Sequence, residues 1–280
     1  MGSRWLRLAP LAPLALGAGL TAACGPAPKA GTVQVQLVGE VTILDFVALS
    51  GKANNVSVTL DGTAFLVTET GGITAGSGCT AVNATTARCQ ANVITARLDL
   101  LDGNDTANVT ALSISSSLLG GTGNDRLTAG IGNDSLRGGE GDDTLTAGGG
   151  LDILQGDEGR DALDGGAGDD TLAEAGTAAS TDVVDADTYT GGTGVDLTSY
   201  APGTAPVTVT LDDVANDGRS AEGDNVKADV ENLNGGSAND RFTGDADANV
   251  LLGLNGWGRA ARRAGERPAV RRQRRRLGRW

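Results

Sequence analysis

The chain is poor in the residues that most enzymes use for chemistry and in those that fill large cores. It has 280 residues, no histidine, three cysteines and one methionine, and only 3 % of its residues are aromatic. The lack of histidine excludes Ser–His and Cys–His nucleophilic pairs and histidine-ligated zinc sites. Neither a GxGxxG fingerprint nor a Walker-type phosphate loop occurs. A carboxylate-pair glycosidase is compatible with the residue types, but the aromatic platforms of sugar sites are scarce. We therefore expect no enzymatic activity.

Positive charge is scarce in the long central part of the chain. Residues 1–30 carry +3, and residues 257–280 carry +9 from ten arginines and one glutamate. Because the whole chain has a net charge of −13, residues 31–256 carry −25. A body this acidic favours a cation as partner and disfavours nucleic acid or anionic lipid.

Glycine and aspartate are abundant, and they recur with a fixed period. Six consecutive nine-residue units fill residues 120–173, with Gly at the fourth position, Asp at the sixth and Leu at the eighth of every unit. The leucines are Leu127, Leu136, Leu145, Leu154, Leu163 and Leu172. A period of nine with these residues in phase is typical of a parallel β-helix or β-roll.

The unit at 138–146 illustrates the chemistry. Its glycines permit the positive φ angles of a tight turn and leave backbone carbonyls uncovered. Asp143 adds a carboxylate, and oxygen ligands of both kinds suit Ca²⁺. Leu145 lies in a short strand and is expected to face inward. A metal-free array of polar turns is the alternative, but residues 120–173 hold twelve acids and little more than one Leu per turn. So thin and acidic a core predicts that folding depends on the cation.

These units resemble the RTX, or haemolysin-type, calcium-binding repeats of bacteria. The resemblance implies a right-handed roll in which each ion lies between two loops of one edge, held by turn carbonyls and the aspartates. It implies roughly four ions, with the pairs Asp125–Asp143 and Asp143–Asp161 on one edge and Asp134–Asp152 and Asp152–Asp170 on the other. The expected ligand residues of the six units are Gly121, Gly123, Asp125, Gly130, Gly132, Asp134, Gly139, Gly141, Asp143, Gly148, Gly150, Asp152, Gly159, Asp161, Gly166, Gly168 and Asp170. Two departures weaken the later sites, because Leu151 stands where Asn or Asp is usual and Asp157 replaces the second Gly.

The N-terminus has the pattern of an export signal. Arg4 and Arg7 precede an apolar stretch at 8–20, which is short for a membrane span. Residues 20–25 resemble a bacterial lipoprotein lipobox, although the usual Leu lies one place nearer the cysteine. We expect a signal peptide at 1–24, lipidation of Cys24 and membrane attachment through it, with ordinary signal cleavage as the alternative. Both place the protein at the cell surface or outside the cell.

After a linker at 25–31, residues 32–119 are expected to form a small β domain. Apolar and polar residues alternate at 32–37, 55–60 and 93–101, as in half-buried strands. Cys79 and Cys89 are expected to form a disulfide in an exported protein, with two free thiols as the alternative. Residues 99–106 resemble one Gly-x-Asp unit, which either starts the calcium-binding array early or forms a plain hairpin turn.

The period breaks after residue 173. We expect a loop at 174–190 and a second, degenerate RTX-like array at 191–256, with Asp196 and Asp240 as further calcium ligands. The Arg-rich, aperiodic residues 257–280 are either a nucleic-acid or membrane-binding tail or, as we prefer, the product of a reading-frame shift.

The sequence thus predicts an all-β chain in which a small N-terminal β domain precedes a right-handed parallel β-roll of nine-residue calcium-binding repeats. The function that fits best is an exported, non-catalytic RTX protein that folds on binding Ca²⁺, with no nucleic-acid partner. One alternative is a surface adhesion or matrix scaffold with a protein or glycan partner. Another is the truncated calcium-binding part of a larger RTX hydrolase or toxin, which the N-terminal signal disfavours.

Overall fold

The computed structural model describes residues 31–39, 41–90, 92–174, 186–201 and 203–254, and the backbone of 259–261. The predicted signal peptide, Cys24, nearly all of the predicted linker and most of the predicted C-terminal tail lie outside these residues. Within the described part, all regular secondary structure is β-strand. In the same residues, no helix is long and apolar enough to cross a membrane. The prediction of an all-β fold with parallel sheets is confirmed.

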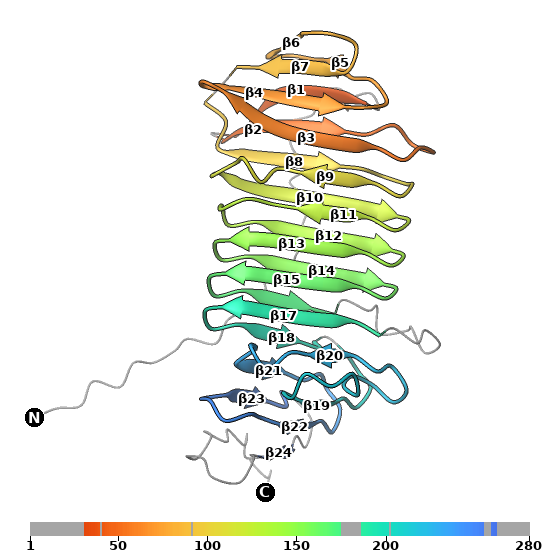
Figure 1. The fold of residues 1–280 in the computed structure, drawn as a ribbon, viewed down its shortest axis with the longest axis vertical. Helices are drawn as coiled ribbons and strands as arrows, with labels where there is room; N and C mark the ends of the chain where they lie inside the picture. Colours follow the sequence, from red (N-terminus) through yellow and green to blue (C-terminus); the bar gives the residue numbers. More distant parts are fainter. Residues whose placement is uncertain are drawn as a thin grey trace, which may run out of the picture.

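Two long sheets face each other along the molecule (Figure 1). The first contains, in spatial order, β23 (Val250–Leu252), β21 (Asn232–Asn234), β18 (Leu197–Ser199), β16 (Thr171–Ala173), β14 (Ile153–Glu158), β12 (Ser135–Glu140), β10 (Ser115–Thr122), β8 (Thr95–Asp99), β2 (Val41–Val47), β1 (Thr32–Val38) and β5 (Thr74–Ala75). The second contains β20 (Asn225–Val226), β17 (Thr188–Thr193), β15 (Ala162–Ala167), β13 (Thr144–Gly149), β11 (Arg126–Thr128), β9 (Thr106–Asn108), β3 (Asn55–Asp61), β4 (Ala64–Glu69), β7 (Thr86–Cys89) and β6 (Cys79–Ala81). A short third sheet contains β19 (Thr208–Thr210), β22 (Arg241–Thr243) and β24 (Arg259–Ala261).

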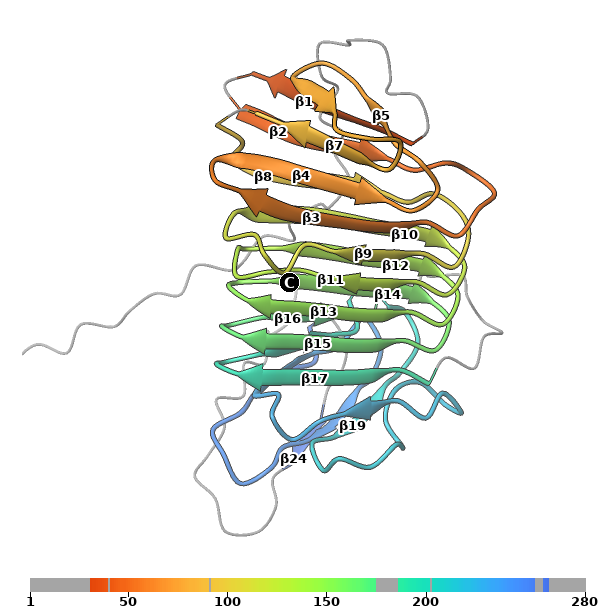
Figure 2. The ribbon, with the colours of Figure 1, turned by 45° about the horizontal axis from the view of Figure 1, so that its top comes forward.

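The six repeat units make three coils, each with one strand in either sheet. Successive strands pair in parallel, so Leu118, Leu136 and Leu154 stack in the first sheet. In the second sheet, strands β11, β13 and β15 follow one another (Figure 2), and Leu127 pairs with Leu145, which pairs with Leu163. Every one of these leucines is at most 2 % exposed. One inward-facing leucine per strand is therefore the core of the roll, as the repeat predicts.

The N-terminal region continues both sheets. Its hairpins β1–β2 and β3–β4 are antiparallel, but β2 pairs in parallel with β8, and β3 pairs in parallel with β9. The predicted domain boundary at residue 119 falls inside β10, and one hydrophobic core runs from Val33 to Leu251. A disulfide joins Cys79 in β6 to Cys89 in β7. Residues 32–119 therefore form the end of the roll, where the sheets change from antiparallel to parallel pairing.

The roll also extends past the predicted loop at 174–190. Strand β17 begins at Thr188 inside that range and pairs in parallel with β15. Further on, the chain leaves the two long sheets to form β19, which pairs with β22. Arg259–Ala261, near the start of the predicted aperiodic tail, form β24 beside β22.

Candidate calcium-binding edges

The loops between the two sheets form two opposite edges of the roll. Edge A consists of the loops that lead from the first sheet to the second, at 101–105, 120–125, 138–143 and 156–161. Edge B consists of the loops that lead back, at 129–134, 147–152, 165–170 and 191–196. Loops on one edge lie directly above one another because the strands that flank them pair in register.

One carboxylate oxygen of each aspartate ties its loop to the loop before. On edge A, the Asp125 N–H donates to Oδ1 of Asp143 at 2.7 Å, and the Asp143 N–H donates to Oδ1 of Asp161 at 2.8 Å. On edge B, the Asp134 N–H donates to Oδ1 of Asp152 at 2.7 Å, and the Asp152 N–H donates to Oδ1 of Asp170 at 2.9 Å. The structure thus places together each of the four aspartate pairs that the sequence suggested.

The second carboxylate oxygen has no such bond in most of these aspartates. Among the described residues, Oδ2 has no hydrogen-bond donor, although it is buried, in Asp105, Asp125, Asp143, Asp152, Asp170, Asp196 and Asp240. Leaving a buried charged oxygen unsatisfied is costly. Burial raises the pKa of Asp143 to about 7 and the pKa values of Asp125 and Asp152 to about 6, with hydrogen bonds from the backbone opposing the shift. Each of these buried Oδ2 atoms therefore needs a bound cation or a proton to compensate its negative charge.

The glycines leave room for carbonyl oxygens beside these carboxylates. At Gly139, where φ is +121°, a Cβ would lie 1.9 Å from the carbonyl oxygen of Gly121. At Gly150, where φ is +144°, it would lie 2.0 Å from the carbonyl oxygen of Gly132. At Gly138 it would lie 2.1 Å from Oδ2 of Asp143. Carbonyl and carboxylate oxygens thus converge between successive loops, and this donor set fits Ca²⁺.

The other expected glycines follow the same geometry with two exceptions. Positive φ angles occur at Gly121, Gly123, Gly141, Gly148, Gly159, Gly166 and Gly168. Gly130 and Gly132 are not in this conformation, but they are as closely packed. A Cβ at Gly130 would lie 2.2 Å from the carbonyl oxygen of Leu112, and one at Gly132 would lie 2.4 Å from that of Ile114.

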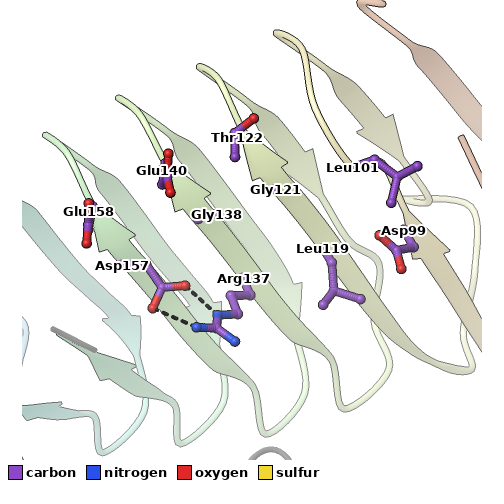
Figure 3. A pocket seen from close by; sticks show the side chains of 11 residues that line it. Asp99, Leu101, Leu119, Gly121, Thr122, Arg137, Gly138, Glu140, Asp157 and Glu158 are labelled. Atoms are coloured by element: carbon purple, nitrogen blue, oxygen red, sulfur yellow. Dashed lines mark hydrogen bonds and ion pairs between the residues drawn. The ribbon is translucent and has the colours of Figure 1, made fainter. Parts of the chain in front are cut away.

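Asp157, which replaces a glycine, keeps the turn of its unit. Its φ is +76°, and it pairs in register with Gly139. Arg137 on the neighbouring strand forms an ion pair with its carboxylate (Figure 3). Gln155 Nε2 also donates to its Oδ1, at 2.9 Å. These contacts hold a side chain in a backbone conformation that otherwise favours glycine.

Leu151 also interrupts a second ladder, at the fifth position of the units. There Asn133 Oδ1 accepts the N–H of Leu151 at 3.0 Å, and Asn124 Oδ1 accepts the N–H of Asp142 at 3.2 Å. A leucine side chain cannot accept a hydrogen bond, so one bond of this ladder is missing at Leu151, and on edge B the ladder resumes where Asp169 Oδ1 accepts the N–H of Val195 at 3.0 Å. The aspartate pair Asp152–Asp170 is nevertheless in place.

Of the two aspartates expected in the second array, only Asp196 joins an edge. The Asp170 N–H donates to Oδ1 of Asp196 at 2.8 Å, so edge B continues past the inserted segment. Asp240 lies instead at the start of the third sheet, where its Oδ1 accepts the N–H of Val207 at 3.2 Å. The facing loop at 203–207 contains no acid. Asp240 therefore has no aspartate partner there.

Asp187 extends edge A but lies inside the predicted loop. Its Oδ1 accepts the Asp161 N–H at 2.8 Å, and its Oδ2 accepts the Tyr189 hydroxyl at 2.9 Å. The separation of 26 residues exceeds the usual 18 by eight. One signal was available in the sequence, because counting nine residues back from Asp196 leads to Asp187.

A further buried group of acids surrounds an arginine. Glu174, Glu222 and Asp224 bring their carboxylates within 4.8 Å of one another. Arg219 forms ion pairs with both glutamates, and the Tyr200 hydroxyl donates to Oδ2 of Asp224 at 3.0 Å. Arg219 and the Tyr200 hydroxyl thus compensate part of the negative charge of this group, and Asp224 also continues edge A, because its Oδ1 accepts the N–H of Asp187 at 3.1 Å.

Residues 119–154, 137–172 and 228–256 match the family model described as RTX calcium-binding nonapeptide repeat (4 copies). The chain contains RTX calcium-binding repeats. The matched residues between 119 and 172 include the loops whose aspartates form the central part of both edges. The protein is therefore a calcium-binding RTX repeat protein with many buried aspartates in the array. Asp105, Asp187 and Asp196 lie outside the matched RTX residues. No curated protein sequence matches the chain significantly.

Proposed function

We propose that this RTX protein is exported and non-catalytic, and that its repeats fold when Ca²⁺ binds. One observation carries the proposal: aspartates stack along both edges, each with one oxygen bonded to the preceding coil and the other, in most of them, buried with no donor in the part of the chain that the structure describes. Without a cation these like charges repel one another. Divalent ions between the loops remove the repulsion and connect the coils, so binding and folding are coupled.

Two further observations support the finer parts of the proposal. RTX repeat proteins are typically secreted, and the N-terminal sequence has the pattern of an export signal. Calcium would then bind outside the cell. The absence of histidine and the use of most repeat carboxylates in the edges support a non-catalytic role.

The proposal is tested by far-UV circular dichroism and calorimetry on the full chain. We expect calcium to produce a cooperative gain of β signal together with binding heat, and magnesium at the same concentration to produce neither. Magnesium demands a smaller, octahedral shell and keeps several waters. A chain with full β signal in chelator and no calcium heat contradicts the proposal. A screen with glycoside and ester substrates in calcium tests the non-catalytic part, and calcium-dependent turnover contradicts it.

A surface scaffold role is the second candidate, favoured by apolar side chains on edge B. Ile131 is 70 % exposed, Leu151 58 % and Val195 54 %, and all three lie in loops of this edge. If they form a binding surface, the calcium-loaded chain binds cells or glycans, and the variant I131S/L151S loses that binding while its calcium heat is unchanged. Equal binding by the variant and the wild type rules out this surface.

A further inference from the structure

The loop at 101–105 has the geometry of an RTX loop although it lies outside the matched repeats. Leu101 and Gly103 have φ angles of +73° and +125°, and they occupy the positions at which the next loop has Gly121 and Gly123. A Cβ at Gly121 would lie 1.8 Å from the carbonyl oxygen of Leu101, and one at Gly123 would lie 1.9 Å from that of Gly103. Figure 3 shows Leu101 on the coil next to Gly121. The carbonyl oxygens of this loop thus point toward loop 120–125, as those of Gly121 and Gly123 point toward the next loop.

Asp105 completes the oxygen set of this loop. It is 2 % exposed, and its N–H donates to Oδ1 of Asp125 at 2.7 Å, the bond that connects every pair on this edge. Its own Oδ1 accepts the N–H of Asn54 at 2.6 Å. Its Oδ2 is buried and has no donor among the described residues. The carboxylate of Asp125 and the carbonyl oxygens of Leu101 and Gly103 therefore face the gap between the two loops. The carboxylate of Asp105 lies close enough to act on Asp125, because burial and, in addition, the charge of Asp105 raise the pKa of Asp125 to about 6.

We propose an additional Ca²⁺ site between loops 101–105 and 120–125, one coil before the first matched repeat, with Asp105 and Asp125 as its carboxylate ligands. The proposal rests on the proposed function, since it requires the edges to bind calcium at all. It places the first calcium site of edge A one coil nearer the N-terminus and makes Asp125 a residue shared by two sites.

Asn54 explains why edge A starts at this site. It occupies the aspartate place of the preceding loop, and a Cβ at Gly103 would lie 2.4 Å from the carbonyl oxygen of Lys52 in that loop. The side-chain amide of Asn54 donates to the carbonyl oxygens of Leu49 at 3.3 Å and Lys52 at 2.9 Å, and to Oδ1 of Asp105 at 3.2 Å. These are oxygens that a cation would otherwise take. The side-chain amide of Asn54 therefore takes the place of an ion, and the series of calcium sites on edge A ends there.

Edge B starts one coil later for a similar reason. Ser116 stands where an aspartate would, and its hydroxyl donates to Oδ1 of Asp134 at 2.8 Å. Oδ2 of Asp134 accepts the N–H of Gly130 at 3.4 Å. Ser116 in β10, one coil before the first loop of edge B, thus supplies a hydroxyl in place of a second carboxylate, and the two edges begin with different residues.

The test counts calcium ions by calorimetry on the full chain, with calcium as the only added metal. We expect Asp105→Asn to bind one ion fewer than wild type, because Asn keeps the Oδ1 acceptor but loses the charge. The control Asp102→Asn removes a charge from the same loop while its Oδ1 still accepts the N–H of Gly51. It should bind as many ions as wild type. An unchanged count in D105N overturns the site, whereas a wild-type chain that binds no calcium overturns the proposed function as well.

Two further measurements cover the case in which D105N does not fold. In the wild-type chain, the carboxyl ¹³C resonance of Asp105 should shift on calcium addition together with that of Asp125. A resonance that stays in place while that of Asp143 shifts overturns the site. The variant Asn54→Asp should bind one ion more than wild type, because it restores a carboxylate to the preceding loop. An unchanged count overturns the assignment of Asn54 as the residue that replaces an ion.

Discussion

The N–H of Asp125 and the carboxylate of Asp143 meet at 2.7 Å across 18 residues of sequence, and this bond uses only one of the two carboxylate oxygens. Oδ1 connects the coils, and Oδ2 is buried with no donor from any residue that the structure describes. An asparagine keeps the first interaction and loses the negative charge on which the second depends. Replacement of Asp by Asn therefore separates coil pairing from calcium binding, which replacement by Ala does not.

The number of ions lost should depend on how many sites share the aspartate. Asp143→Asn should remove two ions, because Asp143 pairs with both Asp125 and Asp161. Asp134→Asn should remove one, since its other neighbour on edge B is Ser116. We expect the calcium midpoint of the β signal to rise about tenfold or more for D143N, equivalent to ~1.4 kcal/mol, and by less for D134N.

Asp142→Asn is the matched control for this comparison. Asp142 is adjacent to Asp143, but its side chain is 53 % exposed and its Oδ1 accepts the N–H of Arg160, as an asparagine would. The calcium midpoint of D142N should equal that of wild type. Equal midpoints for D143N and D134N would be inconsistent with sites shared along an edge.

The stability of the calcium-free fold should fall as the pH rises. The folded-state pKa is about 7 for Asp143 and about 6 for Asp125 and Asp152, whereas the ordinary value is 3.8. Between about pH 4 and 7 the folded chain therefore binds more protons than the unfolded chain, and this stabilisation is lost as the pH rises through the folded pKa values. In calcium-free buffer we expect more β signal and a higher Tm at pH 5 than at pH 8.

With calcium present, the stability of the fold should instead increase with pH, because the ion competes with protons for the same carboxylate oxygens. Calcium titrations followed by circular dichroism at pH 5 and pH 8 should give a lower midpoint at pH 8. A calcium midpoint independent of pH across this range would show that the buried carboxylates are not the ligands.

Adjacent glycines on edge B should respond very differently to a methyl group. Gly150 has a φ of +144°, and a Cβ added there would lie 2.0 Å from the carbonyl oxygen of Gly132. At Gly149 φ is not positive, and the atom nearest to an added Cβ would lie 3.5 Å away. Gly150→Ala should cost about 1–3 kcal/mol from backbone strain alone, and it should also displace the carbonyl oxygens of one calcium site. Gly149→Ala should be nearly neutral. Thermal unfolding in saturating calcium measures both, and comparable Tm losses would contradict the packing described for Gly150.

The repeat allowed the central coils and their aspartate pairs to be predicted, but not where the edges end. The four pairs from Asp125 to Asp170 were implied by the resemblance to RTX repeats, and the structure shows them between loops that are 18 residues apart on one edge. Asp105 and Asp125 are 20 residues apart, and Leu101 stands where the repeat has glycine, so local sequence left both a calcium loop and a hairpin turn open. Asp125 and Asp170 were therefore expected at the ends of the edges, whereas the structure pairs them further with Asp105 and Asp196.

Other differences arise from pairing between distant segments. Alternating residues at 32–37 and 55–60 predict strands, but they do not show that β2 and β3 join the parallel sheets through β8 and β9. Asp240 has the right position within its unit, yet its pairing depends on the loop at 203–207, which the chain brings there from another coil. Residue spacing specifies a ligand within its own loop, and the facing loop decides whether a second ligand is present.

The ion pair between Arg137 and Asp157 should matter only because Asp157 occupies a glycine position. Asp157 is 8 % exposed with a φ of +76°, and Arg137 supplies its positive partner from β12. Arg137→Met should cost about 1–3 kcal/mol, because it leaves the buried carboxylate of Asp157 with the Gln155 amide as a donor but without its positive partner. In the background of Asp157→Gly, which restores the repeat, the same replacement should cost much less. Arg160→Met is the control, since the ion pair of Arg160 is with the half-exposed Asp142, at 3.8 Å. Chemical unfolding in calcium measures the free energy of unfolding of all members of this double-mutant cycle. An equal cost of Arg137→Met in both backgrounds would mean that the arginine acts through its packing on β12 instead of through Asp157.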